Sequence, residues 1–200
     1  MKKFLVMLYP GFCYFEVSAL VEALAFEKDW TMTTVGAERR LYESEEHLQV
    51  MAQTDFSQVD PLKASLIILP GIDNYHVPLD DERNVAFLRR LDTVHRPVIA
   101  AMSSSPVLLA KAGLLTQTHF TGGIFEETYA KNPFIPKQNL QRQPVVIDNG
   151  IVTSSFQFFR EFAIATLRTC GLKIGETAFA PARTDRSYTA DELTYHYSED

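Results

Sequence analysis

Continuous runs of apolar residues along the chain predict strands that are buried on both faces of a sheet. Residues 3–9 (KFLVMLY), 64–71 (ASLIILPG) and 97–102 (PVIAAM) are runs of this kind. Residues 30–36 (WTMTTVG) are rich in β-branched and aromatic side chains and end at a glycine, which favours a further strand. Uninterrupted apolar runs of this length are typical of parallel sheets that are covered on both sides.

Segments with apolar residues at helical spacing separate these runs. Residues 14–28 repeat apolar side chains four positions apart. Residues 80–95 carry acids in the first turn and basic residues near the end, as the helix dipole prefers. Residues 106–113 begin with a proline, which the first turn of a helix tolerates, and end at a glycine. The last predicted long helix covers residues 156–171.

Two further segments predict hairpins. Residues 144–155 hold an Asn-Gly pair between two short apolar runs, which is a strong signal for a tight hairpin turn. Residues 41–56 are mixed and polar and predict a second, short hairpin. Residues 172–200 are polar and contain one predicted short helix that starts at Thr189.

Strands that alternate with helices predict a mostly parallel sheet with helices on both faces. No internal repeat or linker interrupts the pattern, and 200 residues are within the range of one domain. The sequence therefore predicts an α/β three-layer sandwich over residues 1–171. Residues 172–200 are expected to form a C-terminal extension that packs on this domain or trails from it.

Composition and charge argue against several classes of protein. The net charge is −6 and no basic cluster is present, so we expect no nucleic-acid partner. The longest apolar runs are too short to span a membrane, and Pro10 and Gly11 end the N-terminal run too early for a signal peptide. Cys13 and Cys170 lack CxxC spacing, which predicts neither a disulfide framework nor a zinc site. We expect a cytoplasmic protein without a metal or cofactor.

Three loops follow the carboxyl ends of predicted strands, where parallel sheets bind their ligands. These loops are YPGFCYFE (9–16), LPGIDNYH (69–76) and MSSSP (102–106). The third loop places three serines between a buried strand and a helix. Because the first turn of a helix offers unpaired N–H groups and a positive dipole end, this position suits an anion or a nucleophile.

The same three loops resemble the ThiJ/PfpI family of the class I glutamine-amidotransferase-like fold. The family runs from a strand through PGF into a helix that carries an acid, here Glu16, and its elbow IAAICxxPxxLAxAGLL is similar to IAAMSSSPVLLAKAGLL. Further matches at LIILPGI, THFTGG and VVIDNGIVTSSFQFFREFA extend the resemblance over about residues 2–170. The resemblance implies a flavodoxin-like three-layer sandwich, a small-molecule pocket at the elbow and a homodimer.

The chain departs from the family pattern at two positions that carry chemistry. The family nucleophile is a cysteine, and the aligned residue here is Ser103. The histidine that often follows in the family aligns near Gly123. Of the usual cysteine, histidine and acid, the chain keeps the acid Glu16. The resemblance therefore implies a pocket whose catalytic set is altered.

The resemblance assigns Ser103 and Glu16 as the candidate catalytic residues. Serine is a poor nucleophile unless a base accepts its proton, so Ser103 is alternatively a small helix cap. Burial would raise the pKa of Glu16 and let it act as acid or base, whereas a solvated first-turn glutamate is the alternative. The predicted substrate pocket, with its oxyanion donors, comprises Gly71, Ile72, Ser104, Cys13, Gly122 and Gly123.

Two histidines and one cysteine complete the candidates. His76 and His119 are the residues that could serve Ser103 as a base, since triads are defined by geometry and not by sequence order. Each is equally compatible with a solvated loop histidine. Cys13 is interpreted as a replacement thiol or redox sensor, or alternatively as an ordinary half-buried cysteine.

Two functional hypotheses follow. The first is a hydrolase (amidase or protease-like), hydratase or glyoxalase-like enzyme that acts on a small electrophile or amide by a mechanism altered at Ser103. The second is a catalytically degenerate relative that binds a metabolite or a protein partner in stress response or signalling, including redox signalling through Cys13. Whether Ser103 or Glu16 is activated distinguishes the two.

Overall fold

A seven-stranded sheet lies at the centre of the computed structural model, which describes residues 1–175, 178–179 and 189–190. The strand order is β10-β11-β9-β7-β1-β3-β6, and every neighbouring pair is parallel except β10–β11. The strands are β1 (Lys2–Leu8), β3 (Trp30–Gly36), β6 (Thr54–Asp55), β7 (Leu66–Leu69), β9 (Val98–Met102), β10 (Val145–Asp148) and β11 (Ile151–Ser154). The predicted, mostly parallel sheet is therefore confirmed.

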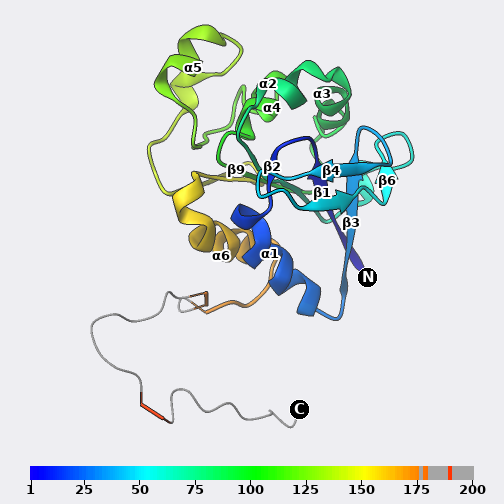
Figure 1. The fold of residues 1–200 in the computed structure, drawn as a ribbon. Coiled ribbons are helices and arrows are strands. Elements are labelled where there is room, and N and C mark those ends of the chain that lie inside the picture. Colours follow the sequence, from blue (N-terminus) through cyan, green and yellow to red (C-terminus); the bar gives the residue numbers. More distant parts are fainter. Residues whose placement is uncertain (176–177, 180–188, 191–200) are drawn as a thin grey trace.

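Helices cover both faces of this sheet (Figure 1). Helices α1 (Phe15–Phe26) and α6 (Phe159–Thr169) pack against each other on one face. The opposite face carries α2 (His76–Asp80), α3 (Glu82–Arg89) and α4 (Pro106–Lys111). Helix α5 (Glu126–Lys131) lies on this side of the sheet as well, at the upper left of Figure 1. This arrangement is the predicted α/β three-layer sandwich.

Two small sheets join the loops at the carboxyl ends of the strands. Strands β2 (Phe12–Cys13) and β8 (Gly71–Ile72) pair antiparallel, which connects the loop after β1 to the loop after β7. Strands β4 (Leu41–Glu43) and β5 (Gln49–Met51) form a hairpin within the segment where the sequence predicts one. Because β2 leads into α1, its pairing with β8 helps to position the first turn of that helix.

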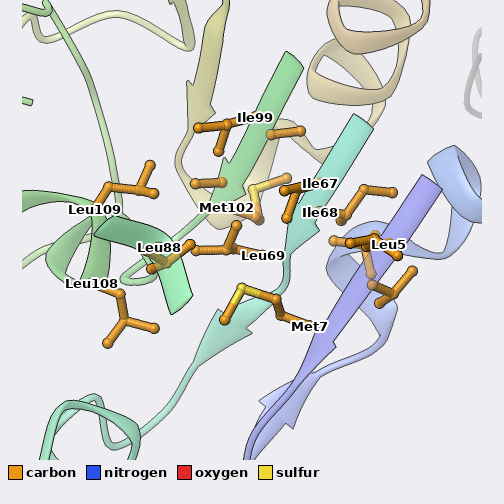
Figure 2. Close-up of a cluster of buried hydrophobic side chains, with 14 of the residues drawn as sticks. Leu5, Met7, Ile67, Ile68, Leu69, Leu88, Ile99, Met102, Leu108 and Leu109 are labelled. Atoms are coloured by element: carbon orange, nitrogen blue, oxygen red, sulfur yellow. The ribbon is translucent and has the colours of Figure 1, made fainter. Parts of the chain in front are cut away.

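The sheet and its covering helices share one apolar core. Figure 2 shows Leu5 and Met7 of β1 beside Leu69 of β7, with Leu88 of α3 and Leu109 of α4 packed against them. All five side chains are fully buried. Removing one such side chain from water contributes about 1.5–3 kcal/mol to stability. The buried strand ends therefore form a fixed base for the loops that follow them.

The bounds of the four helices predicted within residues 1–171 all differ from the prediction, and α4 ends at Lys111 instead of residue 113. Residues 80–95 contain the last residue of α2 and all of α3. The Asp81 side chain accepts a hydrogen bond from the Arg83 N–H at the start of α3, and this helix ends at Arg89. A short 3₁₀ turn, Phe156–Phe158, precedes α6, so the helix predicted over 156–171 begins at Phe159. Helix α1 is shorter than the predicted 14–28 at both ends. Two other 3₁₀ turns cover Pro61–Lys63 and Lys137–Asn139.

The predicted Asn-Gly hairpin is confirmed in detail. Asn149 and Gly150 join β10 to β11 with φ angles of 49° and 71°, the paired positive values that a type I′ turn requires. The short helix predicted from Thr189 falls largely outside the described residues. Among the residues that the structure describes, no helix is both long enough and apolar enough to cross a bilayer.

Candidate functional site

The three loops predicted to meet at the sheet edge surround a cavity of about 430 Å³. Ser103 and Ser104 line it from the loop after β9, and Glu16 lines it from the first turn of α1. Three aromatic side chains also line it: Tyr75 belongs to the loop after β7, and Phe125 and Phe156 come from two further segments. A cavity of this size is typical of sites for small molecules.

The three serines between β9 and α4 have different partners. The Ser105 hydroxyl donates to Leu69 O at 3.1 Å and lies 2.8 Å from Met102 O. The Ser104 hydroxyl donates to Ile72 O, which ties the elbow to the loop after β7. These two hydroxyls therefore hold neighbouring loops together, and Ser104 lines the cavity beside Ser103.

Backbone hydrogen bonds hold Ser103 in an uncommon conformation. Its φ angle is 57°, in the left-handed region that costs a residue with a β-carbon about 1–2 kcal/mol. The Ser103 N–H donates to Ser154 O at 2.8 Å, and Ser103 O accepts from the Gly123 N–H at 2.7 Å. Ser103 is therefore a strained residue between a strand and a helix that is held from two sides and lines the cavity.

Gly71 allows Glu16 to approach Ser103. A β-carbon at Gly71 would lie 1.8 Å from Glu16 Oε2 and 2.8 Å from Ser103 Cβ, so no larger residue fits without movement. Gly123 is similarly close to the elbow, since a β-carbon there would lie 3.0 Å from Ser103 Oγ. Glycine at both positions lets two loops and one helix meet around the serine.

Glu16 is a buried acid with one unpartnered oxygen. Its side chain is 7% exposed, and Oε2 is buried without a hydrogen-bond partner. Burial, together with the negative charge of Glu45, raises the pKa of Glu16 to about 7. The nearby Ser103 hydroxyl and Gly71 N–H oppose part of this rise in pKa. Near neutral pH, Glu16 is therefore divided between its neutral and ionised forms.

The turn between β4 and β5 brings two more acids to this end of α1. Glu46 Oε1 accepts a hydrogen bond from the Phe15 N–H at 2.8 Å, and Oε2 accepts one from the Tyr14 N–H at 3.3 Å. Partial burial raises the pKa of Glu46, but hydrogen bonds from the Phe15 N–H and other groups outweigh this effect and lower the pKa to about 2. Glu45 lines the cavity itself. The turn thus caps the helix and adds negative charge beside Glu16.

Cys13 lies behind the cavity and does not line it. Its side chain is 4% exposed, and Sγ donates to Glu46 Oε1 at 3.4 Å. Burial and the neighbouring Glu45 raise the pKa of the thiol far above its ordinary value. Ligand atoms of Cys13, Glu45 and Glu46 lie within 4.8 Å of one another, the one such grouping among the described residues. The Glu46 oxygens already bind backbone N–H groups, and the thiol is protonated.

Neither candidate histidine lines the cavity. His119 Nδ1 lies 3.0 Å from Asp148 Oδ2, and its backbone N–H donates to the same oxygen, so β10 holds it away from the elbow. His76 begins α2 and lines a different cavity with Arg89 and Lys111. Within the described part of the chain, no histidine, lysine, arginine or cysteine side chain lines the cavity at Ser103.

The structure brings together most of the residues that the sequence points to. Glu16, Ile72, Ser103, Ser104 and Gly123 line the cavity, and Gly71 lies directly behind Glu16. Gly122 borders a neighbouring cavity of about 270 Å³. Several lining residues carry no signal in the sequence analysis: Glu45, Ile124, Phe125, Thr128 and Phe156.

Solved structures with the same fold come from several organisms. A DJ-1 superfamily protein from Agrobacterium tumefaciens has 21% sequence identity and a TM-score of 0.75, with 90% of this chain and 95% of that chain covered. A thiJ/pfpI family protein from Bacillus anthracis has 22% identity and a TM-score of 0.74, over 86% of this chain and 84% of that chain. Oxidized DJ-1 from Toxoplasma gondii has 19% identity and a TM-score of 0.68, over 86% and 95% respectively.

These likenesses establish the fold, and a family model extends the comparison to the sequence. No curated protein matches the chain significantly. The model of the DJ-1/PfpI family matches residues 2–169, which include every strand of the sheet, the elbow and Glu16. The chain therefore belongs to the DJ-1/PfpI family.

Proposed function

We propose that the cavity at Ser103 is an active site in which Glu16 transfers a proton while water adds to a small carbonyl compound. The observation that carries this proposal is the state of Glu16. Its carboxyl group is buried, has an unpartnered oxygen, and has a pKa of about 7 beside the elbow. Proton transfer is most effective when the pKa of the group lies near the working pH.

The chemical step needs only groups that line the cavity and the substrates themselves. Ionised Glu16 accepts a proton from water while the water oxygen bonds to the carbonyl carbon. The carbonyl π electrons move to the carbonyl oxygen, toward which the Ser103 hydroxyl and the Ser104 N–H are proposed to donate hydrogen bonds. Glu16 then returns the proton to that oxygen, which completes hydration. In hydrolysis of an amide, Glu16 instead gives the proton to the nitrogen, the oxyanion re-forms the carbonyl, and the C–N bond breaks as the amine leaves.

Ser103 serves in this proposal as a hydrogen-bonding group and not as a covalent nucleophile. The elbow carries Ser103 where the family pattern has a cysteine, and a serine needs a base to attack a carbonyl. The cavity offers no histidine or lysine of the described residues for that purpose. The protonated, buried Cys13 is not a substitute nucleophile, because the thiolate is the reactive form.

The test measures turnover of a panel of small aldehydes, amides and esters by wild type, Glu16→Gln and Ser103→Ala. We expect Glu16→Gln to lower kcat/KM by about 10²–10⁴-fold, the usual contribution of a general acid–base group. Ser103→Ala should cost less than Glu16→Gln. Wild-type kcat/KM should rise with pH through about 7, where Glu16 ionises. Full activity of Glu16→Gln would contradict the proposal.

A fluorophosphonate serine probe separates the water mechanism from an acyl-serine mechanism. We expect no labelling of wild type in an intact-mass measurement, with Ser103→Ala as the control. Labelling of wild type but not of Ser103→Ala would show an activated serine and overturn this account of the step.

A second candidate function is binding of a small molecule without turnover. The lack of a histidine or lysine in the cavity lining, among the described residues, favours it. Saturable binding at the cavity, combined with no turnover of any panel compound, would support this candidate over the first.

The proposed partners are a small-molecule ligand and a second copy of the chain. The α1 side chains Phe15 and Phe26 are 53% and 81% exposed, which leaves apolar area on the helix for such a contact. Sedimentation equilibrium of the full chain tests the dimer, and a monomer at micromolar concentration would contradict it.

A further inference from the structure

Three acidic side chains line the cavity at Ser103, and no basic side chain of the described residues does. Glu16 lines the floor, Glu45 reaches it from the turn between β4 and β5, and Asp73 follows β8. No lysine, arginine or histidine side chain among the described residues lines the same space. Three acids around a concave surface produce a negative potential that attracts cations and repels anions.

The buried acid at the floor indicates that this charge is directed at a ligand. Glu16 is more than nine-tenths buried, and its Oε2 lacks a hydrogen-bond donor. A buried carboxylate oxygen without a partner is costly and usually binds a donor, and the Ser103 hydroxyl and Gly71 N–H near Glu16 offset only part of the cost of burying this group. Glu45 and Glu16 both line this cavity, and the negative charge of Glu45 contributes to the raised pKa of Glu16. A positively charged donor would bind the unpartnered oxygen of Glu16 and reduce the repulsion between Glu16 and Glu45.

The walls suit the apolar part of an organic cation. Phe125 and Phe156 line the cavity although they are 80% and 51% exposed, so two phenyl rings are available at its opening. Tyr75 forms another wall, and its hydroxyl accepts a hydrogen bond from Asn132 Nδ2 at 3.2 Å, which holds the ring in place. Aromatic rings attract organic cations through their π electrons and bury apolar groups at the same time.

We propose that this cavity binds a small organic cation, a primary ammonium group attached to an apolar group. The ammonium lies among Glu16, Glu45 and Asp73, and the apolar part lies against the aromatic walls. The inference rests on the proposed function, because it names the substrate class of the same site. The substrate would be a carbonyl compound that carries an ammonium group.

Three probes of nearly equal shape test whether the cavity prefers a cation to a neutral compound or an anion. Benzylammonium, benzyl alcohol and benzoate are titrated into the full chain by isothermal calorimetry at about pH 8, above the pKa of Glu16. We expect benzylammonium to bind about tenfold more tightly than benzyl alcohol, since a partly desolvated cation gains both ionic and ring contacts. Benzoate should bind most weakly.

A matched pair of variants shows whether the cavity causes the preference. Glu45→Gln should weaken benzylammonium roughly threefold or more and leave benzyl alcohol unchanged. Glu22→Gln removes the same charge from an exposed position of α1 outside the cavity and should change neither affinity. Equal affinity for the three probes, tighter binding of benzoate, or no binding of benzylammonium at millimolar concentration would each overturn the proposal.

The two proposals fail in distinguishable ways. If benzylammonium binds as expected but wild type turns over no carbonyl compound, the cation site stands and the proposed catalysis falls. If wild type turns over neutral carbonyl compounds in a Glu16-dependent manner and shows no preference for the ammonium probe, the catalysis stands and the cation site falls.

Discussion

Glu46 caps the helix that carries Glu16 by accepting a hydrogen bond from the Phe15 N–H at 2.8 Å. The cap comes from the turn between β4 and β5, not from the residues just before the helix. The N-cap residue of α1, Tyr14, makes no side-chain capping hydrogen bond. The orientation of the first turn, and with it Glu16, therefore depends on a distant hairpin.

Replacing this cap should weaken both the helix and the site. Glu46→Gln keeps an acceptor oxygen but loses the charge, and Glu46→Ala loses both. We expect Glu46→Ala to lower the unfolding free energy by roughly 1 kcal/mol, the usual effect of removing a helix cap, and Glu46→Gln to lower it less. Chemical denaturation measures both values. Wild-type stability of Glu46→Ala would contradict the capping role.

Enlarging Gly71 should displace Glu16. The β-carbon of Gly71→Ala would lie 1.8 Å from Glu16 Oε2, so we expect an overpacking cost of about 1–3 kcal/mol in unfolding free energy. The double variant Gly71→Ala/Glu16→Asp shortens the acid and should recover part of that loss. If Gly71→Ala is as stable as wild type, the two groups are not in close contact.

The left-handed backbone at Ser103 should make glycine the more stable replacement there. Ser103→Ala keeps the β-carbon at a φ of 57°, whereas Ser103→Gly removes it. We expect Ser103→Gly to exceed Ser103→Ala in unfolding free energy by about 1 kcal/mol, after the greater flexibility of unfolded glycine is subtracted. Thermal or urea unfolding of both variants provides the measurement. The reverse order of stability would show that the elbow is not strained.

The raised pKa of Glu16 should make the protein less stable as the pH rises toward neutrality. The folded protein holds this proton up to a pH of about 7, whereas the unfolded chain releases it near 4.5. The folded state therefore binds more protons between these values, and stability falls with rising pH across that window. The pKa of Glu46 is about 2, so its own effect lies at lower pH.

A Glu16→Gln variant isolates this effect. The unfolding free energy of wild type, minus that of Glu16→Gln, should fall by roughly 3 kcal/mol between pH 4.5 and pH 7.5. Urea unfolding at a series of pH values measures the difference. A difference that does not change with pH would mean that Glu16 keeps its ordinary pKa.

Both cysteines should be unreactive in the folded protein. Burial raises the pKa of Cys13 well above its ordinary value and the pKa of Cys170 to about 11, so little thiolate forms near neutral pH. Iodoacetamide should alkylate native protein far more slowly than denatured protein. A Ser103→Cys variant supplies the positive control, because its thiol would face the cavity. Rapid alkylation of native Cys13 would support the redox hypothesis.

The strands were predictable because their signal is local. Each central strand is an uninterrupted apolar run, and burial on both faces requires such a run wherever it occurs in the chain. The Asn149-Gly150 turn was predictable for a similar reason, since few residue pairs tolerate two positive φ angles. Helix α5 was missed because six residues, Glu126–Lys131, are too few for a periodic pattern to emerge.

The remaining parts of the site depend on contacts between distant segments. Glu45 is an exposed residue in a polar turn, and nothing in its own surroundings in the sequence points to a cavity. Its backbone N–H donates to Phe12 O at 3.0 Å, and this long-range bond brings the turn to the end of β2. His119 shows that nearness in sequence does not ensure nearness in the fold. It lies four residues before Gly123, but its ring contacts Asp148 of β10 and not Ser103.

The two hydrogen bonds that hold the elbow have a consequence for protein synthesis. Both partners of the Ser103 backbone, the Gly123 N–H and Ser154 O, are later in the sequence than the serine itself. A ribosome that has released β1, β7 and β9 has therefore delivered the strands beneath the site but not the groups that fix its strained residue. The elbow acquires its shape only when β11 joins the edge of β9, so the site is completed late, by the part of the chain that emerges after it.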